Sequence, residues 1–583
     1  MGFINPTPPP FEYQEWKQRP HLERIKVLAQ DWAVNGFGTP TFVYLLYIFK
    51  LVLYAGGGLL LISATTAGLG GLGNLSDWWT EPIVFQKAVI WTMLWEVLGL
   101  GAGSLPLTLR FSPMIGGFLY WLRPGTTRLP PWPERVPLTR GTQRTLFDVA
   151  VYAGLIAAAL NLLLSDGIDA TAVTAGRLDP IAVGVLLALL ALLGLRDKVP
   201  FLAARAEIYG NLAIVFLFPL TNMVVAAQLV FVCIWWGAAS SKLNRHFPFV
   251  VTVMISNTPW NRWRAAKRHL YRNHPEDLRP SAIGKLSAHL GTAIEFTLPL
   301  ILLVSQGGTI GAIAVAGMVI FHLHILSTFP LAVPLEWNIF MVFGLLFLFG
   351  HYGATSFSTL DDPLLLAILA VTCVGLPVLG NFRPDLVSFL PSMRYYAGNW
   401  ATSQWLFRRQ GGAEAKLDRD LVKPAPIVTE QLAKFYDPEL IDVLVYKGLA
   451  FRSMHSHGRA LNGLVQRAVD DVEDYSVREG ELVAGVVLGY NFGDGHFHDQ
   501  RLLAAIQERC RFEPGEVRVV VLESQPAGVQ RQHYRIFDAA TGLVEEGLVD
   551  VADMVQRQPW LDGQPFPVET VRTAGTDRAK TPA

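Results

Sequence analysis

The stretch Phe231-Val-Cys-Ile-Trp-Trp-Gly-Ala-Ala-Ser-Ser-Lys-Leu-Asn244 is apolar until its last residues, where it places Lys242 at the edge of a segment that fits a lipid bilayer. A charged ammonium group in hydrocarbon costs on the order of several kcal/mol, so such a lysine either reaches water with its long side chain or serves a buried polar site. Glu96, Glu295 and His322 also fall inside apolar segments. Together these residues are the candidates for a site embedded in the membrane.

The composition of the whole chain indicates a membrane protein. Of its 583 residues 51% are hydrophobic and 16% are charged, and the mean hydropathy is +0.33. A soluble protein carries roughly 25% charged residues. The deficit is concentrated in residues 41–400, where several windows of about 17–22 apolar residues are long enough to cross a bilayer core. The sequence therefore predicts an all-α polytopic membrane protein with a small soluble domain at its C-terminal end.

We expect about nine to ten transmembrane helices. The predicted spans are 41–64, 83–104, 147–165, 180–195, 208–241, 286–305, 308–328, 335–352 and 363–381. The 208–241 stretch contains Pro219 and is too long for one untilted span. It is predicted to form either two short helices or one long helix followed by a short crossing through 246–258. Residues 105–122 are predicted to add a re-entrant or interfacial piece.

The distribution of lysine and arginine predicts the orientation. The loop 123–144 carries five arginines, and the loop 259–285 carries seven lysines or arginines. The loops 65–82 and 166–179 carry almost none. Basic loops face the cytoplasm and attract anionic lipid headgroups. With an even number of crossings, both termini are predicted to be cytoplasmic in the cell membrane. The formal net charge of zero gives no reason to expect a nucleic-acid partner.

Residues 1–40 are predicted to be an amphipathic interfacial segment. A helix over 12–33 would place Leu22, Ile25, Leu28, Ala29 and Trp32 on one face, with lysines and arginines around it. Such a helix is typical of the headgroup layer of a membrane. The first 40 residues lack the short apolar core of a cleavable signal peptide, so we expect the first span to drive insertion.

The sequence after the last span divides into three predicted parts. The transmembrane domain at 41–382 is followed by a juxtamembrane connector at 383–424, a soluble α+β domain at 425–565 and a disordered tail at 566–583. The strand-like runs of the soluble domain are 481–490, 517–523 and 533–538. Its helical patterns are 429–448, 457–474 and 498–510.

Lys242 allows two interpretations. At the end of an apolar helix, a lysine commonly extends to water and stabilises the helix dipole. A desolvated lysine, in contrast, is a usable base. The small residues from Gly237 to Ser241 would let a flat ligand approach closely, and Trp235, Trp236 and Ser241 are predicted to contact it.

Glu295 and His322 are the other predicted site residues. A carboxylate within a span must pair, be protonated or face a wet cavity, and the candidate partners of Glu295 are Lys50, Lys87, Lys242 and His322. Glu96 carries the same alternatives. His322 and His324 point in nearly opposite directions on a helix and cannot jointly bind a metal. Each is either a hydrogen-bonded structural histidine or, for His322, a redox or proton-transfer group.

The soluble domain contains two further His-x-His pairs, His455/His457 and His496/His498. Residues two apart share a face of an extended strand, so metal binding is geometrically allowed. Two ligands are a weak signal, and no metal is predicted. Cys233, Cys373 and Cys510 are too far apart in the sequence to suggest a metal site or a disulfide framework. Phosphate-binding, dinucleotide-binding, serine-hydrolase and zinc-protease motifs are not found in the sequence.

Two resemblances concern the chain as a whole and its middle part. The Met1-Gly-Phe start, the proline-rich leader, the Gly36-Phe-Gly-Thr-Pro turn and the end near Gln558-Pro-Trp560 resemble an uncharacterised family of actinobacterial transmembrane proteins. Residues 205–380 more distantly resemble the transmembrane domain shared with vitamin K-dependent gamma-carboxylases, through Ala238-Ala-Ser-Ser-Lys242-Leu-Asn, Glu295-x-x-x-Pro299 and Phe321-His322. That resemblance implies that Lys242 acts as a base on a reduced quinone, with Glu295 and His322 as polar residues of the same site.

Two classes of function remain open from the sequence. The first is a membrane protein that binds or handles an envelope lipid or another lipid-soluble molecule, and we favour it. The second is a membrane-embedded enzyme that uses a quinone and Lys242 as base. The two are distinguished by whether Lys242, Glu295 and His322 meet in one cavity.

Overall fold

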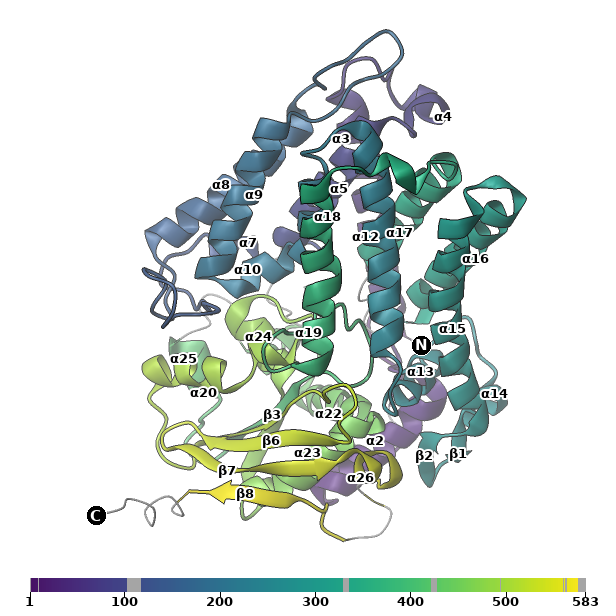
Figure 1. Cartoon of the computed structure of the whole chain (residues 1–583). Helices are drawn as coiled ribbons and strands as arrows, with labels where there is room; N and C mark the ends of the chain where they lie inside the picture. Colours follow the sequence, from purple (N-terminus) through teal and green to yellow (C-terminus); the bar gives the residue numbers. More distant parts are fainter. Residues whose placement is uncertain are drawn as a thin grey trace.

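The computed structural model describes residues 2–8, 10–101, 117–328, 335–420, 427–492, 494–558, 560 and 564–574. A bundle of long helices stands on a C-terminal domain built around a β-sheet (Figure 1). Six helices in the described residues are long and apolar enough to cross a membrane. They are α3 (Thr41–Ala64), α8 (Leu146–Leu164), α12 (Leu220–Ser241), α15 (Ala282–Ser305), α16 (Gly308–Thr328) and the helix Pro363–Phe382, which comprises α18, η6 and α19.

Shorter apolar helices account for the remaining predicted spans. They are α5 (Pro82–Val97), α9 (Pro180–Arg196) and α17 (Leu335–Leu345), which continues into η4 (Leu346–His351). Large apolar side chains on the outer faces of the long helices are exposed, as Phe49 and Val52 are on α3 and Ile310 and Ile313 on α16. An apolar surface of this extent requires lipid around it. The predicted class, a polytopic helical membrane protein with a small sheet-containing C-terminal region, is confirmed.

The region around Pro219 is divided differently from either predicted arrangement. The chain forms α10 (Lys198–Ala203), η3 (Ala206–Gly210) and α11 (Asn211–Val215) before Pro219, and α12 starts directly after it. A proline lacks the amide hydrogen that continues a helix, which explains the break. The helix α13 (Phe247–Ser256) has 10 residues and is about 15 Å long, half the thickness of a bilayer core. The predicted short crossing through 246–258 is therefore wrong.

Helices α9 and α12 both end at the C-terminal domain. Lys198, just after α9, donates to the His496 carbonyl oxygen over 2.6 Å, and His246, just after α12, lies 2.6 Å from the Ser456 hydroxyl. The start of α12 lies at the opposite end of the bundle, where Asn222 donates to Asp361. The chain between α9 and α12 must therefore return across the bundle through α10, η3 and α11.

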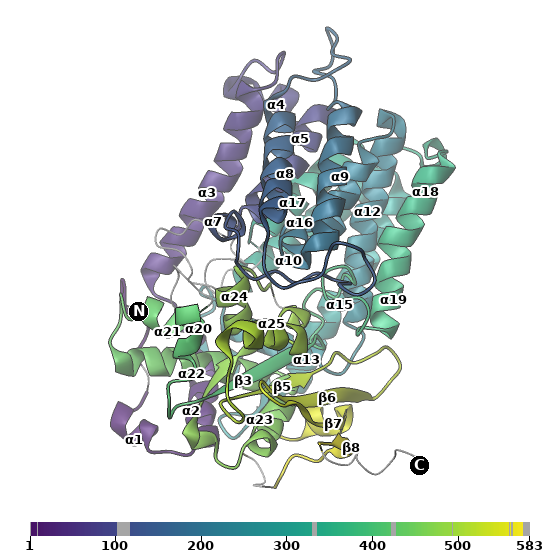
Figure 2. The same cartoon turned by 90° about the vertical axis from the view of Figure 1, so that its left-hand side faces the viewer.

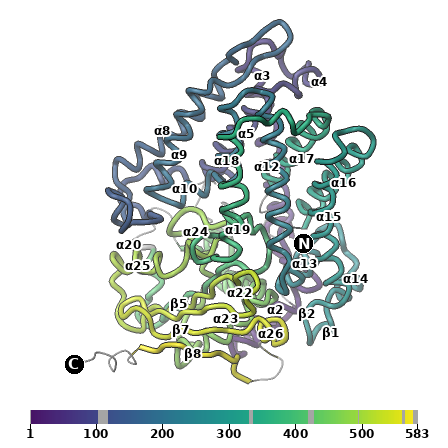
Figure 3. Tube along the Cα trace, in the orientation of Figure 1, coloured from purple at the N-terminus to yellow at the C-terminus, as the bar shows by residue number. Residues whose placement is uncertain are grey.

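The N-terminal helices lie against the C-terminal domain. α1 (Tyr13–Lys17) and α2 (His21–Asn35) are beside α22 (Pro438–Met454), as the purple and green segments of Figure 3 show. Ile25, Leu28 and Trp32 of α2 are fully or almost fully buried in this contact. The prediction that this apolar face lies in the headgroup layer is wrong, because α22 offers it an apolar protein surface. The N-terminal helices thus lie at the same end of the bundle as the C-terminal domain (Figures 1 and 2), and an even number of crossings stays a prediction.

The main sheet has six antiparallel strands in the order β4-β3-β5-β6-β7-β8. Their bounds are β3 (Thr402–Arg408), β4 (Tyr475–Glu479), β5 (Val517–Leu522), β6 (Arg531–Asp538), β7 (Gly542–Asp550) and β8 (Glu569–Thr573). The domain also contains α20 (Ala415–Asp420), α21 (Val428–Leu432), α23 (Ser456–Ala468), α24 (Gly480–Leu488), α25 (Gln500–Cys510) and α26 (Val551–Gln556). Figure 2 shows the sheet below the bundle, with α24 and α25 between them.

Both faces of the sheet are buried at the central strands β3 and β5, whereas the edge strand β8 is mostly exposed. Side chains alternate along a strand, so Val520 and Leu522 pack with α22 and α23, whereas Val519 and Val521 pack with α24 and α25. The core on the α24 and α25 face of the sheet continues into the bundle. There, Tyr120 and Trp121 of α7 (Phe118–Trp121) donate to carbonyl oxygens of α24. The bundle and the C-terminal domain therefore share one core.

Three predicted boundaries differ from the structure. The run 481–490, predicted as a strand, is helix α24, because a short apolar run buried on all sides has the same composition in either state. The connector predicted at 383–424 contains the strand β3, and the tail predicted from 566 contains β8, which pairs with β7. Residues 105–116 of the predicted re-entrant piece and residues 575–583 of the tail lie outside the described residues.

Candidate functional site

Lys242 directly follows the last residue of α12 and is buried. The residue is 7% exposed although it stands at a helix end. The preceding small residues allow this close packing: a side chain at Gly237 would place its Cβ 2.9 Å from the Cβ of Met393. The lysine therefore points into the protein and does not extend to water.

The Lys242 ammonium nitrogen lies 2.6 and 2.5 Å from the two carboxylate oxygens of Glu295. Glu295 comes from the middle of α15 and is 4% exposed. Of the four candidate partners in the sequence, Lys242 is the one that the structure pairs with Glu295. Both charges are out of water, so each depends on the other for compensation. The ammonium also lies 5.4 Å from the centre of the Phe247 ring, which favours a cation.

His322 of α16 is held by two side chains. The Trp235 indole nitrogen donates to His322 Nε2 over 3.0 Å, and His322 Nδ1 lies 2.9 Å from the Asn338 side-chain oxygen. An indole can only donate, so Nε2 accepts, and Nδ1 must carry the hydrogen that it donates to Asn338. The imidazole is therefore neutral in this arrangement. His324 makes neither contact and lies on the exposed outer face near Trp260.

A cavity of about 150 Å³ brings these residues together. Lys242, Glu295, His322, Trp235 and Asn338 all line it. Its apolar wall comes from α13, α16 and α17 and from a tyrosine pair in the segment after α19, through Phe247, Val250, Met254, Phe321, Trp337, Met341, Tyr395 and Tyr396. An apolar cavity of this size accommodates a molecule such as benzene. The site thus combines an ion pair, a neutral imidazole and space for one ring or a short acyl segment.

The cavity reaches the outer surface of the bundle. Ser287 and Gly291 of α15 and His324 of α16 line it and are partly or fully exposed. The neighbouring surface of these two helices is apolar, with Leu290 and Leu323 exposed. A molecule dissolved in the bilayer could therefore enter between α15 and α16.

Two of the predicted ligand-contacting residues do not line this cavity. Trp236 is turned about 100° from Trp235 on the helix and donates to the Phe296 carbonyl oxygen over 3.2 Å. The Ser241 hydroxyl donates to the Ala238 carbonyl oxygen over 2.8 Å. Conversely, Tyr395 and Tyr396 line the cavity but were not predicted, because they lie in an irregular segment. Tyr396 has a φ of 53°, and no periodic pattern precedes it.

Glu96 belongs to a separate buried cluster. It interacts electrostatically with Glu336, Arg205 and Lys50, and the Lys50 ammonium lies 3.5 Å from Glu336. Gly101 approaches the Glu96 carboxylate so closely that a Cβ there would lie 2.3 Å from its oxygen. None of these residues lines the 150 Å³ cavity. Glu96 therefore belongs to the bundle core and not to the Lys242 site.

The four histidines of the two His-x-His pairs have individual partners. His496 Nε2 lies 3.0 Å from Glu523, and His498 Nδ1 lies 2.6 Å from the Ser403 hydroxyl. His455 Nδ1 is 2.8 Å from the Phe451 carbonyl oxygen, whereas His457 lies near Gln532. Among the described residues, no group of three or more His, Cys, Asp or Glu side chains is arranged to hold a metal ion.

The fold and this buried site define a polytopic membrane protein whose helical bundle encloses a mainly apolar cavity lined by a buried ion pair. Over residues 1–571 the chain matches the family described as transmembrane protein of unknown function (DUF3556), and it belongs to that family. No curated protein and no solved structure matches the chain significantly. The actinobacterial origin and the resemblance to gamma-carboxylases therefore stay predictions.

Proposed function

We propose that the protein binds a lipid-soluble molecule, such as an envelope lipid, in the cavity between α12, α13, α15, α16 and α17. The observation that carries this proposal is the buried Lys242–Glu295 ion pair on the wall of a cavity that reaches the bundle surface. A polar group of the ligand would contact the ion pair and the His322–Asn338 pair. An apolar ring or chain would lie against Phe247, Phe321 and Trp337.

The ion pair supports a binding role because it costs stability without a ligand. Two buried charges are often no better for folding than well-packed apolar side chains of similar volume. Lys242 and Glu295 also face a space in which a hydroxyl or carbonyl group would complete their hydrogen bonding. This arrangement suits recognition of a weakly polar group within the bilayer.

Mass spectrometry of lipids that copurify with the full chain in native-lipid nanodiscs tests this function. The variant Lys242→Met/Glu295→Gln removes both charges, so that no buried charge is left unpaired. The matched control is Lys50→Met/Glu336→Gln, a second buried lysine–glutamate pair that does not line the cavity. We expect one lipid class to be enriched with the wild type and the control and lost from the cavity variant. Equal lipid profiles for all three proteins would overturn the proposal.

A second candidate function is a quinone-dependent enzyme with Lys242 as base, and the contact between Lys242 and both Glu295 oxygens favours it. Transfer of a proton from the ammonium to the carboxylate leaves a neutral amine that faces the cavity. That amine can accept the proton of a quinol hydroxyl in contact with it. Copurification of a quinone with the wild type, and loss of quinol oxidation by added dioxygen in Lys242→Met but not in Lys50→Met, would support this function. Absence of quinone from the wild-type nanodiscs would exclude it.

A further inference from the structure

A larger cleft of about 530 Å³ lies at the junction of the bundle and the C-terminal domain. It shares no lining residue with the cavity at Lys242. The turn between α12 and α13 separates the two: Lys242 faces the cavity, whereas Asn244 and Arg245 face the cleft. The remaining walls come from the β2–α15 junction (β2, Asp277–Pro280), the start of α15, and the 525–530 loop between β5 and β6. This volume is within the roughly 300–1,000 Å³ range of small-molecule sites.

The charged lining of the cleft is entirely cationic among the described residues. Arg245, Arg272, Arg279 and Lys285 line it, with His289 one helical turn beyond Lys285. Asp277 pairs with Arg279 at 2.6 Å. Within the described residues, no carboxylate lies within 4 Å of the charged groups of Arg245, Arg272 or Lys285. Three unpaired cations around one concave surface create a strong positive potential.

Two arginines of the predicted cytoplasmic loop 123–144 are arranged differently. Arg128 and Arg144 of the loop 123–144 are buried and pair with Asp148 and Asp197. They are therefore structural residues and cannot attract a ligand from outside. Arg245, Arg272 and Lys285 of the cleft differ from these two arginines because they are exposed and have no carboxylate within 4 Å among the described residues.

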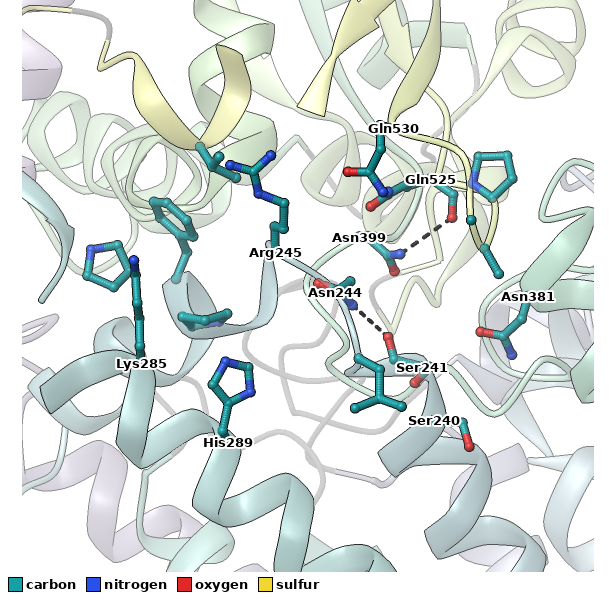
Figure 4. A pocket seen from close by; sticks show the side chains of 18 of the residues that line it. Ser240, Ser241, Asn244, Arg245, Lys285, His289, Asn381, Asn399, Gln525 and Gln530 are labelled. Carbon is teal, nitrogen blue, oxygen red and sulfur yellow. Dashed lines mark hydrogen bonds between the residues drawn. The ribbon is translucent and has the colours of Figure 1, made fainter. Parts of the chain in front are cut away.

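The wall opposite the cations consists of amide and hydroxyl side chains. Figure 4 shows Arg245, Lys285 and His289 on one side and Ser240, Asn381, Asn399, Gln525 and Gln530 on the other. Ser240 and Gln530 are exposed. Amides and hydroxyls both donate and accept hydrogen bonds, so they match the hydroxyl groups of a polyol. The cations match a phosphate group.

Exposed apolar side chains adjoin the basic wall. Leu243 lines the cleft and is 67% exposed. Leu286 and Leu290 of α15, next to Lys285 and His289, are 70% and 58% exposed. Leu286 and Leu290 lie in the first part of α15, a helix long and apolar enough to span a membrane, whereas Leu243 follows the end of α12. Acyl chains packed on them would leave an attached headgroup at the level of the cleft.

We infer that this cleft binds a phosphate-bearing polyol group, with the phosphate on Arg245, Arg272 and Lys285 and the hydroxyls on the opposite amide wall. The adjoining leucines favour the headgroup of an anionic membrane lipid as its source. The inference is independent of the proposed function of the Lys242 cavity, because the two sites have no lining residue in common.

Binding of defined ligands to the full chain in detergent tests the inference. The probes are phosphatidylinositol, phosphatidylcholine and free inositol 1-phosphate. The variant Arg245→Gln/Lys285→Gln removes two cations of the cleft. The control Arg262→Gln/Arg264→Gln removes two exposed cations from the same basic region, outside the cleft. We expect the cleft variant to weaken phosphatidylinositol binding by about tenfold or more and the control to leave it within about twofold.

Each arm of this experiment separates one alternative. If the wild type binds phosphatidylinositol but not inositol 1-phosphate, the ligand of the cleft is a lipid. If it binds both comparably, the cleft is the same phosphate site with a soluble phosphate ester as its ligand. Phosphatidylcholine bound as tightly as phosphatidylinositol would overturn the inference, as would equal losses in the cleft variant and the control. Lipid copurification with Lys242→Met/Glu295→Gln tests the Lys242 cavity and not the cleft. The proposed function and the inference about the cleft can therefore fail independently.

Discussion

The ammonium of Lys242 contacts both carboxylate oxygens of Glu295, which lies 53 residues further along the chain and on a different membrane helix. This pair joins the end of α12 to the middle of α15. It also forms the polar wall of the cavity that we assign to a lipid-soluble ligand.

Removing one partner of the pair should destabilise the protein more than removing both. Lys242→Met leaves Glu295 buried without its counter-charge, which typically costs about 3–5 kcal/mol. Lys242→Met/Glu295→Gln should recover most of that loss. Thermal unfolding of the single and double variants in one detergent measures the coupling. Additive effects of the two substitutions would show that the pair is not formed.

The hydrogen-bond partners of His322 predict its tautomer. Because Trp235 donates to Nε2, the imidazole should be neutral with its hydrogen on Nδ1. Nitrogen NMR of the histidine-labelled protein, with His322→Gln to assign the signal, reads this state directly. A signal from an Nε2-protonated ring would contradict the contact. Trp235→Phe should weaken the preference by removing the donor while retaining an aromatic ring.

The pair formed by His496 and Glu523 predicts how the stability of the C-terminal domain depends on pH. Burial alone lowers the pKa of the His496 imidazole, but the Glu523 carboxylate raises it to about 10. Burial raises the pKa of Glu523, whereas His496 lowers it to about 2. The contribution of His496 is therefore complete below its ordinary pKa of 6.5 and lost as the pH rises through 10. That of Glu523 is complete above 4.5 and lost as the pH falls through 2.

The variant His496→Gln tests this dependence. It should lower the unfolding temperature by several degrees at pH 5.5, where the native pair is fully charged, and by much less at pH 10.5. His533→Gln is the control, because His533 lies on the same sheet but is only half-buried, 3.4 Å from Glu546. A loss for His496→Gln that is the same at both pH values would mean that charge does not stabilise the pair.

Docking of the N-terminal helix on α22 predicts a large effect of Trp32→Ala. Trp32 is 2% exposed and its ring centre is 5.0 Å from that of Phe451. Truncating a buried tryptophan costs about 3–5 kcal/mol, and hydrogen exchange of α22 should increase. The exposed Trp132 provides the control, Trp132→Ala. If α2 instead lay in the headgroup layer, exchange in α22 would be unchanged.

Labelling can test whether the two ends of the chain lie on the same side of the membrane. Single cysteines in place of Glu12 and Thr541, introduced in a variant without the three natural cysteines, should react from the same side of sealed vesicles. An impermeant maleimide added outside would then label both positions or neither. Labelling of only one position would contradict the even number of crossings.

The sequence was sufficient for the class of fold because long apolar windows have few alternatives in a protein. Pro219 likewise marked a helix break. Composition could not tell that α13 is too short to cross a membrane. Apolar periodicity failed at 480–488, where a buried helix and a buried strand have the same composition. The position of α2 was missed because an apolar helical face fits a membrane surface and a protein surface equally well.

The candidate site was predictable in part. Lys242, Glu295 and His322 stood out because charged or titratable side chains are rare in apolar spans. Their pairing depends on how α12 and α15 pack, which no local pattern encodes. Tyr395 and Tyr396 were missed since they lie in an irregular segment where aromatic residues have no distinctive spacing. Trp236 was included wrongly because adjacent residues on a helix point in different directions.

Photo-crosslinking from the cavity wall tests the central claim most directly. The photoreactive residue p-benzoylphenylalanine would replace Phe321, which lines the cavity, or Phe382, which is exposed outside it. After irradiation in native-lipid nanodiscs, mass spectrometry identifies the attached molecule. We predict one dominant lipid-soluble species at position 321, distinct from the mixture of bulk lipids captured at position 382. The same mixture at both positions would contradict a specific binding site at Lys242 and Glu295.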